Sequence, residues 1–141
     1  MKVFGAFFDR PAVLNSVSQA ERKTLSRAGA FVRRTARSSM RRRKKASQPG
    51  QPPSVKQGQL KKFLFFSWDQ QTRSLVVGPE LLSRRAGAPV PSLMESGGVV
   101  RWTKRRTGES RQSKILPRPF MAPALDKNLS ALPEAWRNAL R

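Results

Sequence analysis

Residues 47–79 read SQPGQPPSVKQGQLKKFLFFSWDQQTRSLVVGP, and they contain the only clear β signal in the sequence. A loop rich in proline and glycine leads into an apolar run from Leu60 to Trp68, and the polar segment Asp69–Thr72 provides a turn. A second run follows from Arg73 to Val77 and ends at Gly78 and Pro79. The stretch therefore predicts a β-hairpin.

Both faces of the first predicted strand are apolar. With a period of two, one face carries Leu60, Leu64, Phe66 and Trp68, and the other carries Phe63 and Phe65. A single helix can cover only one face of a small sheet, so the second face needs another layer of the same domain or another subunit. Both solutions fit the sequence, because burial on both faces is ordinary for covered strands.

The charge of the chain points to a polyanionic partner. The 141 residues include 29 Lys and Arg against 8 Asp and Glu, which gives a net charge of +21 without any histidine. Nucleic acid is the first candidate, because neutralised phosphates release counterions whatever the base sequence. A membrane surface is the lesser candidate, and no apolar run of about eighteen residues exists to span a bilayer. The start MKVFGAFF is followed at once by Asp9-Arg10-Pro11, so we expect a cytoplasmic product without a signal peptide and no membrane partner.

Catalysis is not expected. The chain has no cysteine and no histidine, which removes thiol chemistry, nearly all zinc, haem and iron–sulfur ligation, and the usual general base near neutral pH. The eight acidic residues are scattered, with no pair close enough in sequence to suggest a carboxylate dyad or a magnesium site. We therefore predict no enzyme activity, no cofactor and no metal.

A long helix is predicted after an N-terminal arm at residues 1–10. From about Pro11, apolar residues recur at spacings of three and four, apart from a gap at Glu21: Leu14, Val17, Leu25, Ala28, Val32, Ala36 and Met40. Ser18 and Glu21 have the spacing of a capping box, so the long helix could instead begin there. Gly29 should weaken the helix by about 1 kcal/mol unless something packs closely against it. Within the arm, Lys2–Phe8 fits either a short strand or an apolar segment that docks elsewhere.

The end of this helix is strongly basic. A helical spacing places Arg33, Arg37, Arg41 and Lys44 on one face, with Arg34, Arg42, Arg43 and Lys45 beside them. Like charges at these spacings each oppose a helix by roughly 0.2 to 0.5 kcal/mol, so this face serves something other than stability. We predict contact with DNA phosphates and no readout of bases; the alternative is a solvated basic tail favoured by the helix dipole.

The second half of the chain predicts a further hairpin and short helices. Residues 81–91 read as a loop, residues 99–103 as a strand, and residues 104–114 as a basic tip that turns at Gly108 and returns through residues 115–116. The tip carries Lys104, Arg105, Arg106, Arg111 and Lys114, which are further candidates for DNA contact or serve solubility alone. Prolines then introduce helices over residues 122–132 and 133–140. Together these elements predict an α+β fold in a single domain over residues 11–141, with the long helix packed on a small, mostly antiparallel sheet of about four strands and a C-terminal helix.

Three short motifs occur in order along the chain. The loop Pro49–Pro53 is followed by Gly58-Gln59-Leu60, then comes Met94-Glu95-Ser96-Gly97-Gly98, and finally residues 118–125 read RPFMAPAL. These resemble the PGxPP loop with its TGxLRxSI-like strand, the Glu-x-Gly step and the RPFLxPAL helix entry of the small neck, or tail-completion, proteins of tailed bacteriophages. The resemblance covers roughly residues 10–141. We interpret the motifs themselves as parts of the scaffold, with function on the surfaces.

The resemblance implies a structural virion protein of the head–tail junction. It implies a homo-oligomeric ring, of six or twelve subunits, that contacts portal or connector and tail proteins and surrounds double-stranded DNA without sequence specificity. Such a ring would use the second apolar face of the hairpin. The residues expected in the core or between subunits are Phe63, Phe65, Trp68, Phe120, Met121 and Leu125, of which Trp68 and Phe120 should be buried. The alternative is a non-viral basic nucleic-acid-binding protein of ribosomal or nucleoid type.

Overall fold

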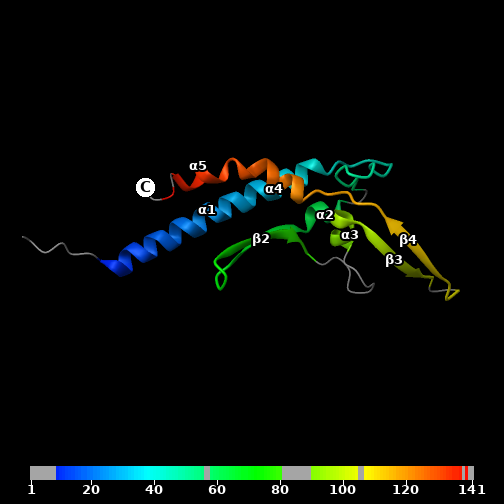
Figure 1. The fold of residues 1–141 in the computed structure, drawn as a ribbon, viewed down its shortest axis with the longest axis horizontal. Helices are drawn as coiled ribbons and strands as arrows, with labels where there is room; N and C mark the ends of the chain where they lie inside the picture. Colours follow the sequence, from blue (N-terminus) through cyan, green and yellow to red (C-terminus); the bar gives the residue numbers. More distant parts are fainter. Residues whose placement is uncertain (1–8, 56–57, 81–89, 105–106, 138, 140–141) are drawn as a thin grey trace, which may run out of the picture.

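A computed structural model describes residues 9–55, 58–80, 90–104, 107–137 and 139, and it confirms the α+β class (Figure 1). The order of elements is α1 Arg10–Ser39, α2 Gln59–Lys62, β1 Leu64–Asp69, β2 Ser74–Pro79, α3 Val90–Ser96, β3 Gly98–Thr103, β4 Ser110–Ile115, α4 Ala122–Leu129 and α5 Leu132–Arg137. The four strands form two separate antiparallel hairpins, β1–β2 and β3–β4, instead of one sheet. Residues 1–8 of the predicted arm at 1–10, and most of the loop predicted at 81–91, lie outside the described residues; residues 9 and 10 of the arm belong to the start of α1.

Helix α1 is continuous from its first residue. The carboxylate of Asp9 accepts a hydrogen bond from the backbone N–H of Ala12 at 3.1 Å, and Pro11 lies in the first turn, where its missing N–H costs nothing. The alternative start at Ser18 is wrong, because Asp9 already caps the helix. Thirty residues make α1 about 45 Å long.

Helix α1 ends at Ser39, before Arg41 and Lys44, which would have to be helical to share a face with Arg33 and Arg37. The hydroxyls of Ser38 and Ser39 donate to the carbonyls of Thr35 and Ala36, which satisfies acceptors in the last turn, and Met40 is extended. Five consecutive cations follow at residues 41–45, and their mutual repulsion opposes another helical turn. The prediction that Arg41 and Lys44 continue the helical face is therefore wrong.

The first predicted hairpin is present with a shorter first strand. Gly58 has a φ of 74°, in the left-handed region, and the chain then makes the short helix α2, so Leu60 is helical and not part of β1. The register pairs Leu64 with Pro79 and Asp69 with Ser74. At the turn, the carboxylate of Asp69 accepts hydrogen bonds from the Thr72 hydroxyl at 2.7 Å and the Gln71 N–H at 2.9 Å; these bonds, the Thr72 one first, lower the pKa of that carboxyl below its ordinary value.

The core lies where the second half of α1 meets β1, the 47–55 loop and α4. Its buried side chains are Val32, Ala36, Met40, Val55, Leu64, Phe120 and Ala124. Gly29 belongs to the same face of α1: a Cβ atom there would lie 2.7 Å from Cδ2 of Leu75 in β2. The absence of a side chain at Gly29 lets the hairpin approach the helix closely. This contact explains why α1 contains a glycine, which is unfavourable in the middle of a helix.

The second half of the chain follows the prediction with shifted boundaries. The predicted strand at 99–103 is β3, but its partner β4 begins at Ser110, so Arg111 and Lys114 lie in a strand and not in a tip. The predicted helices at 122–132 and 133–140 are the shorter α4 and α5. In Figure 1 the β3–β4 hairpin extends away from α1, whereas α4 and α5 run along α1.

The three motifs meet in one place, which we call the motif junction. The N–H of Gly50 donates to the carbonyl of Pro117 at 2.8 Å, and Nε of Arg118 donates to the carbonyl of Ser47 at 2.9 Å. The backbone N–H of Arg118 donates to the carbonyl of Met94 at 2.6 Å. These bonds join segments that are up to 71 residues apart in sequence, so the motifs hold the scaffold together.

The motif junction is completed by one carboxylate. Glu95, at the end of α3, accepts hydrogen bonds from the backbone N–H groups of Phe120 at 3.0 Å, Met121 at 3.2 Å and Ala122 at 2.9 Å. Helix α4 has no capping side chain at its own N-terminus, so Glu95 takes that role from another element.

We predict that Phe120→Ala lowers the free energy of unfolding by about 3 to 5 kcal/mol, because the Phe120 side chain is only 1 % exposed and its removal leaves a cavity. Chemical denaturation measures the change. Phe65→Ala is the matched control, because Phe65 is 47 % exposed and its truncation should cost much less. A cost below about 1 kcal/mol for Phe120→Ala would contradict the packing described here.

We predict that Glu95→Ala lowers the free energy of unfolding by roughly 2 to 4 kcal/mol, because three backbone N–H groups lose a charged acceptor. Glu134→Ala, in the first turn of α5, removes the same charge without breaking these bonds and should cost less than about 1 kcal/mol. Urea denaturation of both variants checks this, and equal losses would show that the carboxylate of Glu95 holds nothing in place.

Candidate nucleic-acid interface

Candidate cations gather around the end of α1 and the segment that follows it, which together we call the basic end. It contains Arg33, Arg34, Arg37, Arg41, Arg42, Arg43 and Lys44. The structure does not place them in one row. Arg33, Arg34 and Arg37 of α1 line one hollow, and Arg41 and Arg43 line another, because the chain leaves the helix between them. Arg42 and Lys44 are exposed and line neither of these two hollows.

Arg33 also has a structural role. Its Nε donates to the carbonyl of Leu64 at 2.6 Å, and its guanidinium lies 5.9 Å from the centre of the Phe65 ring. Arg33 therefore fixes the start of β1 against α1 and partly covers the outer face of the hairpin. A substitution at this position would change folding as well as charge.

The first hollow, which we call the arginine hollow, measures about 440 Å³. It is lined by Ala30, Arg33, Arg34, Arg37, Ser38 and Lys61. Lys61 comes from α2, a contribution that helical spacing in α1 could not reveal. No acidic residue lines this hollow, so its electrostatic potential is positive.

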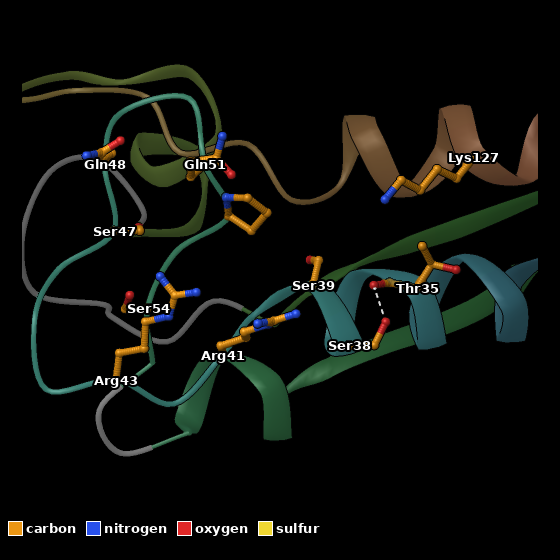
Figure 2. Close-up of a pocket in the computed structure, with 11 residues that line it drawn as sticks. Thr35, Ser38, Ser39, Arg41, Arg43, Ser47, Gln48, Gln51, Ser54 and Lys127 are labelled. Carbon is orange, nitrogen blue, oxygen red and sulfur yellow. Dashed lines mark hydrogen bonds between the residues drawn. The ribbon is translucent and has the colours of Figure 1, made fainter.

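The second hollow, which we call the hydroxyl hollow, measures about 550 Å³ and is drawn in Figure 2. Its lining residues are Thr35, Ser38, Ser39, Arg41, Arg43, Ser47, Gln48, Gln51, Pro52, Ser54 and Lys127. Three elements contribute: the end of α1, the 41–54 segment and α4. Five hydroxyls, two amides and three cations form the wall, and no carboxylate is among them.

Helix α4 brings Lys127 to this hollow. The amide nitrogen of Asn128 donates to the hydroxyl of Thr35 at 3.0 Å and to the carbonyl of Ala124 at 2.7 Å, which fixes the helix at the end of α1. Figure 2 shows the Lys127 side chain extending from α4 on the side of Thr35 and Ser39. Reasoning from the sequence missed Lys127, because it is far in sequence from the basic end. The sequence does show Ser38 and Ser39 shortly before Arg41 and Arg43, and this combination of hydroxyls and cations could have indicated the site.

The predicted basic tip of the second hairpin is a separate region. Nζ of Lys104 lies 3.2 Å from a carboxylate oxygen of Glu109, so its charge is partly neutralised. Arg111 is exposed on β4, opposite Trp102 in the register. Arg105 and Arg106 lie outside the described residues. The described cations of the second hairpin thus lie apart from the basic end, on a hairpin that extends away from α1 (Figure 1).

The expected core or interface residues have different environments. Phe120 is in the core, Met121 packs against it, and Phe63 is half-buried. The prediction that Trp68 is buried is wrong: it is partly exposed, because α1 faces it with polar residues such as Asn15 and Gln19. Leu125 is largely exposed and lines an apolar groove between α1, β2, α4 and α5.

Two further apolar surfaces are uncovered. On the outer face of β1–β2, Phe65 is 47 % and Val76 is 59 % exposed. On α1, every residue from Arg10 to Gln19 is exposed, including Val13, Leu14 and Val17. Sequence reasoning had placed Leu14 and Val17 on the stripe that packs onto the sheet, but the hairpin does not extend far enough along α1 to cover them.

Comparisons with protein-family models, with curated proteins and with solved structures find no match for this chain. Among the described residues, no group of three or more acidic side chains is placed to hold a metal ion. No helix within the described ranges is long and apolar enough to cross a membrane.

We predict that the quadruple change of Arg34, Arg37, Arg41 and Arg43 to Gln flattens the slope of log affinity for duplex DNA against log salt by about three to four units. Each lost phosphate contact removes about 0.9 from that slope. Arg33 is left intact because it holds Leu64. Fluorescence anisotropy with a short DNA duplex, over a range of salt concentrations, measures the slope.

The matched control changes four cations of the second hairpin to Gln: Arg101, Lys104, Arg111 and Lys114. It removes the same formal charge from a region remote from the basic end, and we expect it to flatten the slope by less than about one unit. If the control flattens the slope and the first variant does not, the second hairpin is the DNA-facing surface.

Proposed function

We propose that this protein is a structural subunit of the neck of a tailed bacteriophage, forming a homo-oligomeric ring at the head–tail junction through which double-stranded DNA passes. The observation that carries the proposal is the first third of α1, which extends past the core with Val13, Leu14 and Val17 exposed. A helix whose apolar side chains have no cover within the subunit is suited to packing against another copy.

A ring also needs a second, different surface on each subunit. Contacts of head-to-tail type join two unlike patches and close into a ring when the rotation permits. The apolar groove of about 350 Å³, lined by residues such as Leu25, Leu75, Leu125 and Trp136, is one candidate for the receiving patch. The outer face of β1–β2, with Phe65 and Val76, is another. Only the outer face, which carries Phe65, is the second apolar face that the sequence predicts; the groove lies on the opposite face of the hairpin, where Leu75 pairs with Trp68.

The charge supports a role around DNA. A ring multiplies +21 by its copy number, and the basic end gathers much of that charge at one end of α1. Cations without an ordered set of base-reading side chains hold duplex DNA through its phosphates, independently of sequence. The motif junction supports the proposal in a different way, because the segments that resemble the phage neck proteins contact one another as a scaffold should.

We predict that the double change of Leu14 and Val17 to Ser abolishes the ring while leaving the subunit folded, because both side chains are exposed. Native mass spectrometry should show multiple copies for the unchanged protein and monomers for the variant. Leu116→Ser, which changes an exposed apolar residue elsewhere, is the control and should preserve the ring.

The same measurement on purified virions and their disassembly products tests the biological setting. The chain should be present as a multimer. Its absence from particles, together with a monomeric purified protein that binds nucleic acid, would contradict the proposal and favour a free nucleic-acid-binding protein of ribosomal or nucleoid type.

A further inference from the structure

The hydroxyl hollow has the wall of an anion site. Its three cations, Arg41, Arg43 and Lys127, come from two segments that meet only in the folded chain. Within the described residues there are two ion pairs, Arg73 with Glu21 and Lys104 with Glu109, and neither involves these three cations. Positive charges brought together without a carboxylate repel each other, and an anion between them would remove that repulsion.

One hydroxyl in the wall has no partner. Ser47 is 8 % exposed, and its Oγ is the buried side-chain polar atom that makes no hydrogen bond within the described part of the chain. The backbone of Ser47 is held by the motif junction, since its carbonyl accepts from Arg118 at 2.9 Å. A buried donor without an acceptor is costly and calls for an explanation, and a ligand oxygen would supply the missing acceptor.

Other donors remain available around the hollow. The hydroxyl of Thr35 accepts from Asn128, which leaves its own proton to donate. The hydroxyls of Ser38 and Ser39 already donate to α1 carbonyls, so we do not count them among the donors to an anion. A tetrahedral group with several oxygens can accept from donors on different sides at once, and guanidinium groups match its geometry well.

We propose that the hydroxyl hollow binds a phosphate group, through Arg41, Arg43 and Lys127 with Ser47 and Thr35 as neutral donors. The phosphate belongs either to a free phosphate ester or to a nucleic-acid backbone. A volume of about 550 Å³ exceeds the needs of one phosphate and leaves room for the attached sugar or a second phosphate. The inference goes beyond the neck proposal and does not depend on ring formation.

The test titrates the purified full-length protein with pyrophosphate by isothermal titration calorimetry, with sodium chloride added to keep ionic strength constant. We expect one site per chain. Ser47→Ala should weaken binding about 3- to 10-fold without changing the net charge of +21, because it removes a single hydrogen bond to a charged group. The double change of Arg41 and Arg43 to Gln should weaken it by about 100-fold.

The matched control is the double change of Arg101 and Arg111 to Gln, which removes the same charge from β3 and β4. It should weaken binding by less than about twofold, since distant exposed charges are screened. Equal losses in the two double variants would mean a diffuse attraction to a basic protein and would overturn the site. Unchanged binding in both Ser47→Ala and the Arg41 and Arg43 variant would overturn it as well.

Two additional measurements make the result decisive. Thermal unfolding should show Ser47→Ala at least as stable as the unchanged protein, because the variant loses a buried hydroxyl without a partner. If that variant fails to fold, Lys127→Gln, at an exposed position, replaces it with an expected loss of about tenfold in affinity. A short duplex DNA then distinguishes the sources: displacement of pyrophosphate identifies a backbone phosphate as the ligand, and simultaneous binding of both identifies a free phosphate ester. Because the Leu14 and Val17 variant should still bind pyrophosphate, failure of the ring and failure of this site are separable.

Discussion

The carboxylate of Glu95 accepts backbone N–H groups from three consecutive residues, Phe120 to Ala122, and much of the fold depends on this contact. It caps α4 from outside, because that helix begins without a capping side chain of its own. It also fixes the direction in which the chain enters α4, so that Phe120 reaches the core beside Met40 and Leu64. With α4 in place, Asn128 bonds Thr35 and Lys127 lies at the end of α1. One half-buried carboxylate of the motif junction thus helps to place a distant cation at the surface.

Part of this arrangement was visible in the sequence. The hairpin followed from alternation and a polar turn, α1 from its apolar period, and the face assignment of Leu64, Phe66 and Trp68 agrees with the register. The predicted start of β1 and the predicted end of α1 were wrong, each for a local reason. Leu60 is helical because Gly58 turns the chain into the left-handed region first, and α1 ends at Ser39 because serine hydroxyls close its last turn before a run of cations.

The site was less predictable than the fold. The periodicity of α1 identified Arg33, Arg34 and Arg37. It also predicted that Arg41 and Lys44 continue the same helical face, although they lie after the end of the helix. It could not show that Arg33 is engaged by a carbonyl of β1, since that contact joins residues 31 positions apart. Likewise Lys61, Lys127 and Ser47 enter the hollows through tertiary packing alone. A pattern within one element reports which side chains share a face, and only the packing of several elements reports which of them converge on a ligand.

The placement of charge and of apolar surface along α1 has a mechanical consequence. Exposed apolar side chains occupy its first third, the core occupies the middle and end on one side, and the cations gather at the last turns and beyond. A helix of about 45 Å keeps the two surfaces apart, so a partner subunit docked on Leu14 and Val17 would leave the basic end accessible. Helix α1 is continuous, and hydrogen bonds join its Thr35 to α4 and its Arg33 to β1. It therefore sets a fixed separation between the exposed apolar surface and the basic end. Repeated around a closed assembly, that separation would place every basic end in the same position relative to the subunit contacts, which is the geometry that a uniform hold on a phosphate backbone requires.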